Sequence, residues 1–78
     1  MLISDQNTPE AENKIHFAAN RFVGENGFEV EDNKVFTIYE HGQWWIRFYD
    51  LSEEIDRTFS VIDAEGAGTY DGFAFEEV

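Results

Sequence analysis

The amino-acid sequence predicts an α+β fold, with one N-terminal helix packed on an antiparallel β-meander of four to five strands. Apolar residues recur at spacings of three and four from Ala11 to Phe22, which is the period of one helix face. After Asn26 and Gly27 the pattern changes to alternating apolar and polar residues, broken by short turn signals. A one-sided helix and a one-sided sheet each need an apolar partner, so we expect them to pack together.

The helix is predicted from about Pro9 to Val23. Thr8 can cap it because its hydroxyl accepts a bond from a free N–H of the first turn, and proline suits the first helical position. Gly24 is expected to end the helix. Residues 1–7 precede these signals and are expected to be a flexible N-terminus. The apolar stripe consists of Ala11, Ile15, Ala18, Ala19 and Phe22.

Short alternating runs separated by turn residues predict the strands. Residues 51–56 read as a longer acidic connection, and Gly66, Gly68 and Gly72 mark a loop before the last run. The expected strands are a short one at Phe28–Glu31, then Lys34–Glu40, Gln43–Asp50, Arg57–Asp63 and Phe73–Glu77.

Alternation along Gln43–Asp50 places successive side chains on opposite faces of the sheet. We expect one face to pack under the helix and the other to carry Trp45, Arg47 and Tyr49. The predicted core of the sheet is Trp44, Ile46 and Phe48, joined by Phe59 and Val61 of the next strand.

The register of the hairpin around Gly42 has two solutions. A three-residue loop, Glu40-His41-Gly42, would place Phe36 and Ile38 in the core. It would also leave Val35, Thr37 and Tyr39 beside Trp45. A two-residue loop exchanges the two sets. We favour the three-residue loop because it collects charged side chains on one face.

Length and composition indicate one domain over residues 1–78 with a dense aromatic core. A chain of 78 residues buries only about 60% of its unfolded surface. Eight Phe, three Tyr and two Trp compensate, because each ring buries on the order of 150–250 Å². Without cysteine, neither a disulfide nor a thiolate metal site is possible.

The charge balance indicates the class of partner. Seventeen acidic residues against five Lys and Arg give a formal charge of −12, which repels nucleic acid and anionic membranes and attracts a basic protein surface. Solubility alone is an equally good explanation of this acidity. Residues Met1–Ser4 show no basic segment followed by an apolar run, so we expect a cytoplasmic protein.

No catalytic set is visible, so we expect no enzyme, no cofactor and no metal. His16 and His41 stand alone on the helix and in a turn, without cysteine or a spaced carboxylate. Whether the loop Asp63–Asp71 binds a cation stays open, since its spacing does not match an EF-hand. A ligand pocket would need polar groups from Tyr39, His41 or Tyr70.

The outward residues suggest binding. Trp, Arg and Tyr are the commonest interface hot spots, although they also shield strand backbones on open sheet faces. We interpret the chain as an acidic protein-binding module, an inhibitor or immunity (anti-defence) factor that mimics nucleic acid and covers a basic surface. The alternative is a structural or regulatory homodimer formed through the outer sheet face. The expected partner-binding residues are Trp45, Arg47, Tyr49, Glu29, Glu31, Asp32, Asp50, Glu53, Glu54 and Asp56.

Overall fold

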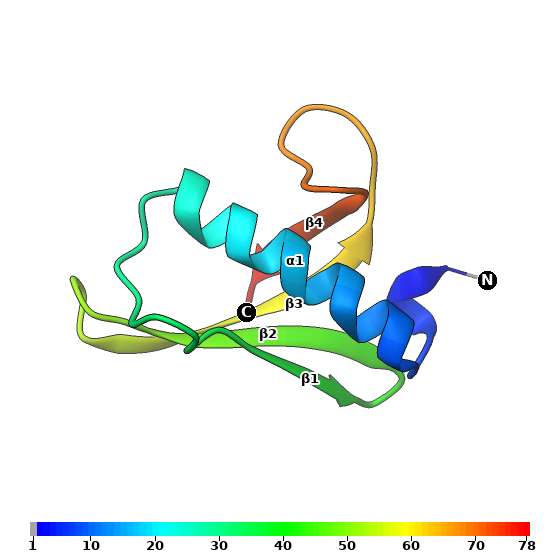
Figure 1. The fold of residues 1–78 in the computed structure, drawn as a ribbon, viewed down its shortest axis with the longest axis horizontal. Helices are drawn as coiled ribbons and strands as arrows, with labels where there is room; N and C mark the ends of the chain where they lie inside the picture. Colours follow the sequence, from blue (N-terminus) through cyan, green and yellow to red (C-terminus); the bar gives the residue numbers. More distant parts are fainter. Residues whose placement is uncertain (1) are drawn as a thin grey trace.

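The computed structural model describes residues 2–78, and it has the predicted α+β architecture. One helix lies across one face of a four-stranded antiparallel sheet with strand order β1-β2-β3-β4 (Figure 1). The prediction of four to five strands is therefore confirmed at four. The elements are η1 (Ile3–Asp5, a 3-10 helix), α1 (Pro9–Glu25), β1 (Phe36–Glu40), β2 (Gln43–Asp50), β3 (Ile55–Asp63) and β4 (Phe73–Glu77).

Helix α1 begins where the sequence places it and ends two residues later. The Thr8 hydroxyl accepts a hydrogen bond from the Ala11 N–H at 3.1 Å, and Pro9 is the first helical residue. Gly24 stays inside the helix, and the chain leaves it at Asn26, whose side-chain amide donates to the Phe22 carbonyl at 2.8 Å. A side-chain bond to a terminal carbonyl thus assists the end of the helix.

The predicted core is confirmed. Trp44, Ile46, Phe48, Phe59 and Val61 are all buried beneath the helix. Phe22 of α1 is the ring that joins the two layers: its centroid lies 5.1 Å from that of Phe59 and 4.8 Å from that of Phe75. Aromatic pairs at such separations add stability beyond the area they bury.

The segment before α1 is bound to the sheet. Ser4 is buried and its hydroxyl donates to the Asp63 carboxylate at 2.7 Å. The Trp44 indole N–H donates to the Gln6 carbonyl at 2.6 Å, and the Tyr39 hydroxyl donates to the Asp5 carbonyl at 3.1 Å. We expected only a flexible N-terminus over residues 1–7. Met1 lies outside the described residues, whereas residues 4–6 are held by side chains of β1, β2 and β3.

The hairpin between β1 and β2 has the two-residue loop, so the favoured three-residue loop is wrong. Glu40 is paired with Gln43, and His41 and Gly42 have φ of 54° and 76°. Two successive positive φ values define a type I′ turn, whose twist matches that of the flanking strands.

This register decides which face each β1 side chain occupies. Thr37 pairs with Ile46 and Tyr39 with Trp44, on the core face. Phe36 and Ile38 turn outward beside Arg47 and Trp45. Phe36, expected in the core, is 53% exposed.

The expected strand at Phe28–Glu31 is not formed. Phe28 is instead an anchor for a loop, with its ring centroid 5.2 Å from Phe48 and 5.9 Å from Phe22. The Glu29 carbonyl accepts one bond, from the Leu51 N–H at 2.8 Å. Alternation arises here because single loop residues dip into the core, which gives the same pattern as a half-buried strand.

Two glycine-to-alanine substitutions separate turn geometry from helix propensity. A Cβ at Gly42 or at Gly24 meets no atom within 4 Å, so neither change creates a clash. Gly42→Ala should destabilise the protein by about 1–2 kcal/mol because the left-handed conformation is costly for alanine. Gly24→Ala should stabilise it by up to about 1 kcal/mol because Gly24 is helical. Urea denaturation measures both, and a Gly42→Ala protein as stable as the wild type would contradict the type I′ turn.

Candidate protein-binding face

The face of the sheet turned away from α1 carries several apolar side chains among polar ones. Figure 1 shows α1 on one side of the sheet and none of the described elements on the other. The register places Ile38, Trp45 and Ser60 in one cross-strand row and Phe36, Arg47 and Thr58 in the next. We name the apolar members the outer patch: Phe36, Ile38, Trp45, Tyr49 and Ile62.

Several residues of the outer patch are well exposed. Phe36 is 53%, Tyr49 45% and Ile62 38% exposed, while Trp45 is half-buried. The Trp45 indole N–H donates to the Glu40 carbonyl at 3.1 Å, which fixes the orientation of the ring. A ring that is already oriented loses less side-chain entropy when a partner covers it.

Arg47 lies in the middle of this face without an ion pair. Elsewhere in residues 2–78, Lys14, Arg21 and Arg57 each contact a carboxylate within 4.0 Å. Arg47 has no such contact among the described side chains and is exposed. Its neighbours in the register are Phe36 and Thr58. The guanidinium is therefore available to a carboxylate of a partner.

Two acidic segments that are separate in the sequence meet at one end of the molecule. The Leu51-to-Glu29 hydrogen bond joins the loop after α1 to the turn between β2 and β3. Both lie at the left end of the view in Figure 1. We name this region the acidic end: Glu29, Glu31, Asp32, Glu53, Glu54 and Asp56, all of which are exposed.

Asp50 does not belong to this surface, which corrects its assignment as a partner-binding residue. It is 1% exposed, and its carboxylate accepts bonds from the Arg57 Nε–H at 2.7 Å and from the Ser52 hydroxyl at 2.9 Å. Asp50 follows Trp44, Ile46 and Phe48 in the inward series of β2, so strict alternation already indicated its burial. Its role is to hold the turn of residues 51–54 and to neutralise Arg57.

Arg57 in turn connects several elements. Its second nitrogen donates to Glu77 of β4 at 2.7 Å, and its guanidinium carbon lies 5.2 Å from the ring centroid of Phe28. Arg57 of β3 therefore links β2, β4 and the loop after α1 near the acidic end.

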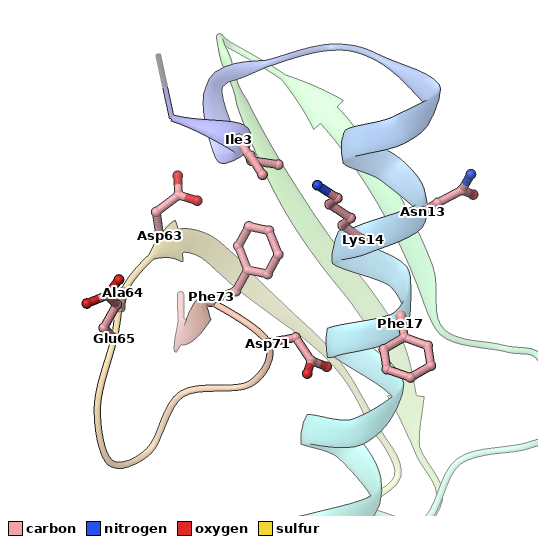
Figure 2. Close-up of a pocket in the computed structure, with 10 residues that line it drawn as sticks. Ile3, Asn13, Lys14, Phe17, Asp63, Ala64, Glu65, Asp71 and Phe73 are labelled. Atoms are coloured by element: carbon pink, nitrogen blue, oxygen red, sulfur yellow. The ribbon is translucent and has the colours of Figure 1, made fainter.

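A hollow that the sequence did not predict lies between η1, α1 and the glycine loop (Figure 2). Its volume is about 790 Å³, and Ile3, Phe17 and Phe73 form its apolar lining. None of the residues considered for a ligand pocket, Tyr39, His41 and Tyr70, lines it.

Two of the three carboxylates that line this hollow, Asp63 and Asp71, are already engaged, and the third is Glu65. Asp63 accepts from Ser4, and Asp71 accepts from Arg21 at 2.8 Å. Across residues 2–78 no three Asp, Glu or His side chains are grouped to hold a metal ion. The hollow therefore provides no chemistry that identifies a ligand.

Comparison of the chain with protein family models, with curated proteins and with solved structures finds no match in any of the three. Of the helices described here, none has both the length and the apolar character needed to span a membrane. We therefore infer the function from the outer patch and the acidic end.

Asp50→Asn should weaken the fold in a pH-dependent way. The hydrogen bond from Arg57 lowers the pKa of the Asp50 carboxyl below its ordinary value of 3.8, against the opposing effect of burial. The stability from ionised Asp50 is therefore complete above pH 3.8 and is lost as the pH falls through the lower folded-state pKa. The difference in urea midpoint between wild type and Asp50→Asn should be largest at neutral pH and shrink below 3.8.

The matched control is Asp56→Asn, which removes the exposed carboxylate next to Arg57 in β3, a carboxylate with no ion pair among the described side chains. It should shift the midpoint little at any pH. A constant difference between wild type and Asp50→Asn across the pH range would contradict the ion pair.

Proposed function

We propose that this protein is an acidic protein-binding module that acts as an inhibitor or immunity-type factor by covering a basic surface of a partner protein. The observation that supports it best is the outer patch, which is uncovered in the described structure and borders the acidic end. Exposed contiguous apolar patches with a polar rim are typical of interaction sites. Trp45 and Tyr49 of this patch, with Arg47 between them, are of the types that contribute most to binding energy.

The two surfaces suit different stages of binding. Negative potential from a chain of charge −12 draws a basic partner in, and such steering raises association rates by about 10–10³-fold. Apolar contact with the outer patch then slows dissociation, which is where affinity within an interface is mostly set. Arg47 adds specificity, since the partner must offer it a carboxylate or leave a charge unpaired.

A strongly basic patch is characteristic of proteins that bind nucleic acid. A module that covers such a surface with carboxylates excludes the nucleic acid, which is the sense in which we propose nucleic-acid mimicry. An immunity or anti-defence role follows if the covered protein is a nuclease, and the cytoplasm is the compartment we propose for it.

Affinity capture from the native cell lysate tests this function. Trp45→Ala should weaken retention of a basic partner by about 2 kcal/mol, roughly thirtyfold, because a central aromatic anchor is lost. Raising the salt should weaken it further, because screening shortens the reach of the acidic end. Circular dichroism confirms that the variant is folded.

The matched control is Phe17→Ala. Phe17 is 64% exposed on α1, on the opposite side of the molecule from the outer patch, and its loss should leave capture unchanged. Retention that changes neither with raised salt nor with Trp45→Ala would contradict this proposal.

The same uncovered patch also favours a second candidate, a homodimer with a structural or regulatory role. Two copies could bury their outer patches against each other, with the charge serving solubility. Sedimentation equilibrium should then show a mass that rises with concentration, and Trp45→Ala should shift it toward the monomer. A wild-type chain that stays monomeric at every concentration would remove this candidate.

A further inference from the structure

The two edge strands of the sheet are β1 and β4. At β4, the first residue is occupied on its outer side: the Phe73 N–H and carbonyl both bond to Tyr70, at 3.0 and 2.8 Å. At β1, no described helix or strand runs along the free side (Figure 1). Open edge strands are usually blunted by charge or proline, yet Phe36, Thr37, Ile38 and Tyr39 are neither.

The register shows which backbone groups of β1 face outward. In an antiparallel hairpin with a two-residue turn, the pair that closes the turn exchanges both hydrogen bonds, and every second pair does the same. Glu40, Ile38 and Phe36 therefore bond to β2, while Thr37 and Tyr39 direct their N–H and carbonyl groups to the free side. Within residues 2–78, no turn or side-chain hydrogen bond reaches these four groups.

Space for side chains exists on both faces beside this edge. On the inner face, a groove of about 390 Å³ runs between α1 and β1, with Glu12, His16 and Thr37 among its lining residues. On the outer face, Phe36 of the outer patch is exposed at the edge itself. A strand added here would direct alternate side chains into the groove and against the outer patch.

The charges of this edge select the chemistry of the added strand. Glu12 accepts a long bond of 3.4 Å from the Thr37 hydroxyl and has no ion pair among the described side chains. Glu40 ends β1 and is exposed. Lysine or arginine on the groove side and apolar residues on the outer side complement this arrangement.

We propose that β1 binds an extended segment of a basic protein by strand addition, with basic side chains beside Glu12 and apolar side chains against Phe36 and Ile38. Main-chain bonds to Thr37 and Tyr39 give the affinity in this mode, and the alternating side chains give the specificity. The inference rests on the proposed function for the class of partner alone. A second copy of the chain is the less suitable occupant, because it brings its own charge of −12 to the edge.

The test uses the full chain and a short synthetic peptide in which lysine and valine alternate. At saturation, hydrogen exchange of the Thr37 and Tyr39 amides, followed by NMR, should slow by about tenfold or more, because they become bonded. The Phe36 and Ile38 amides, already bonded to β2, should change less. The control peptide carries N-methyl groups on alternate residues, which keeps its charge and removes one hydrogen-bonding edge. It should not slow the exchange.

Thr37→Pro should abolish this binding. Proline removes an N–H that faces solvent, so the bonds between β1 and β2 are kept, as in natural edge strands. Thr37→Val is the matched control, because it retains the N–H, and it should bind like the wild type. Should Thr37→Pro unfold, Glu12→Gln tests the charge contact of the same site. We expect it to lower the affinity for the lysine peptide by about two- to fivefold.

Three results would overturn strand addition: unchanged exchange at Thr37 and Tyr39 with peptide bound, equal binding of the N-methylated peptide, or a dimer of the free chain that Thr37→Pro abolishes. Trp45→Ala separates this inference from the proposed function, since it weakens capture by the outer patch and leaves exchange protection by the peptide in place. If no basic partner is captured from the lysate but the peptide still slows exchange at Thr37 and Tyr39, the proposed function is rejected and the edge site is retained.

Discussion

The two-residue turn His41-Gly42 is the constraint on which the rest of the molecule depends. Side chains alternate with a period of two, so adding one residue to this turn would exchange every β1 side chain between the faces. With Glu40 opposite Gln43, Tyr39 reaches both Trp44 and the η1 carbonyl of Asp5, while Phe36 joins the outer patch. The same register directs the free backbone groups of Thr37 and Tyr39 to the open edge.

The inner face shows how a small chain stabilises itself without disulfides. Rings from α1, β2, β3, β4 and the loop after the helix meet around Phe22, Phe28 and Phe59. Polar groups at the border of this core are paired: Ser4 with Asp63, Arg57 with Asp50, and Trp44 with the Gln6 carbonyl. In the described part of the chain, no buried side-chain nitrogen or oxygen lacks a partner. Among the described residues, the inner face therefore offers no unpaired buried polar side chain to a ligand.

The surfaces left over have the opposite character. The outer patch is apolar, the acidic end is charged, and β1 presents unpaired backbone groups at its free side, next to the groove along α1. We propose that these features together suit one kind of partner, a basic protein with an extended segment. This convergence is why we place the function in binding rather than in the hollow beside the glycine loop.

The sequence by itself determined the features that depend on near neighbours in the chain. Thr8 and Pro9 start α1, the three-and-four spacing defines its buried face, and alternation along β2 separates Trp44 from Trp45. Tertiary structure decided what local patterns leave degenerate. Both turn lengths satisfy the alternation of β1. The alternating pattern that begins at Phe28 belongs to a loop, because Phe28 packs on Phe48 in the core.

Alternation directs Asp50 inward, but its partner Arg57 comes from the next strand, and η1 is held by Asp63, nearly sixty positions away in the chain. Local sequence patterns cannot predict such contacts, because the contacts form only when folding brings distant parts of the chain together.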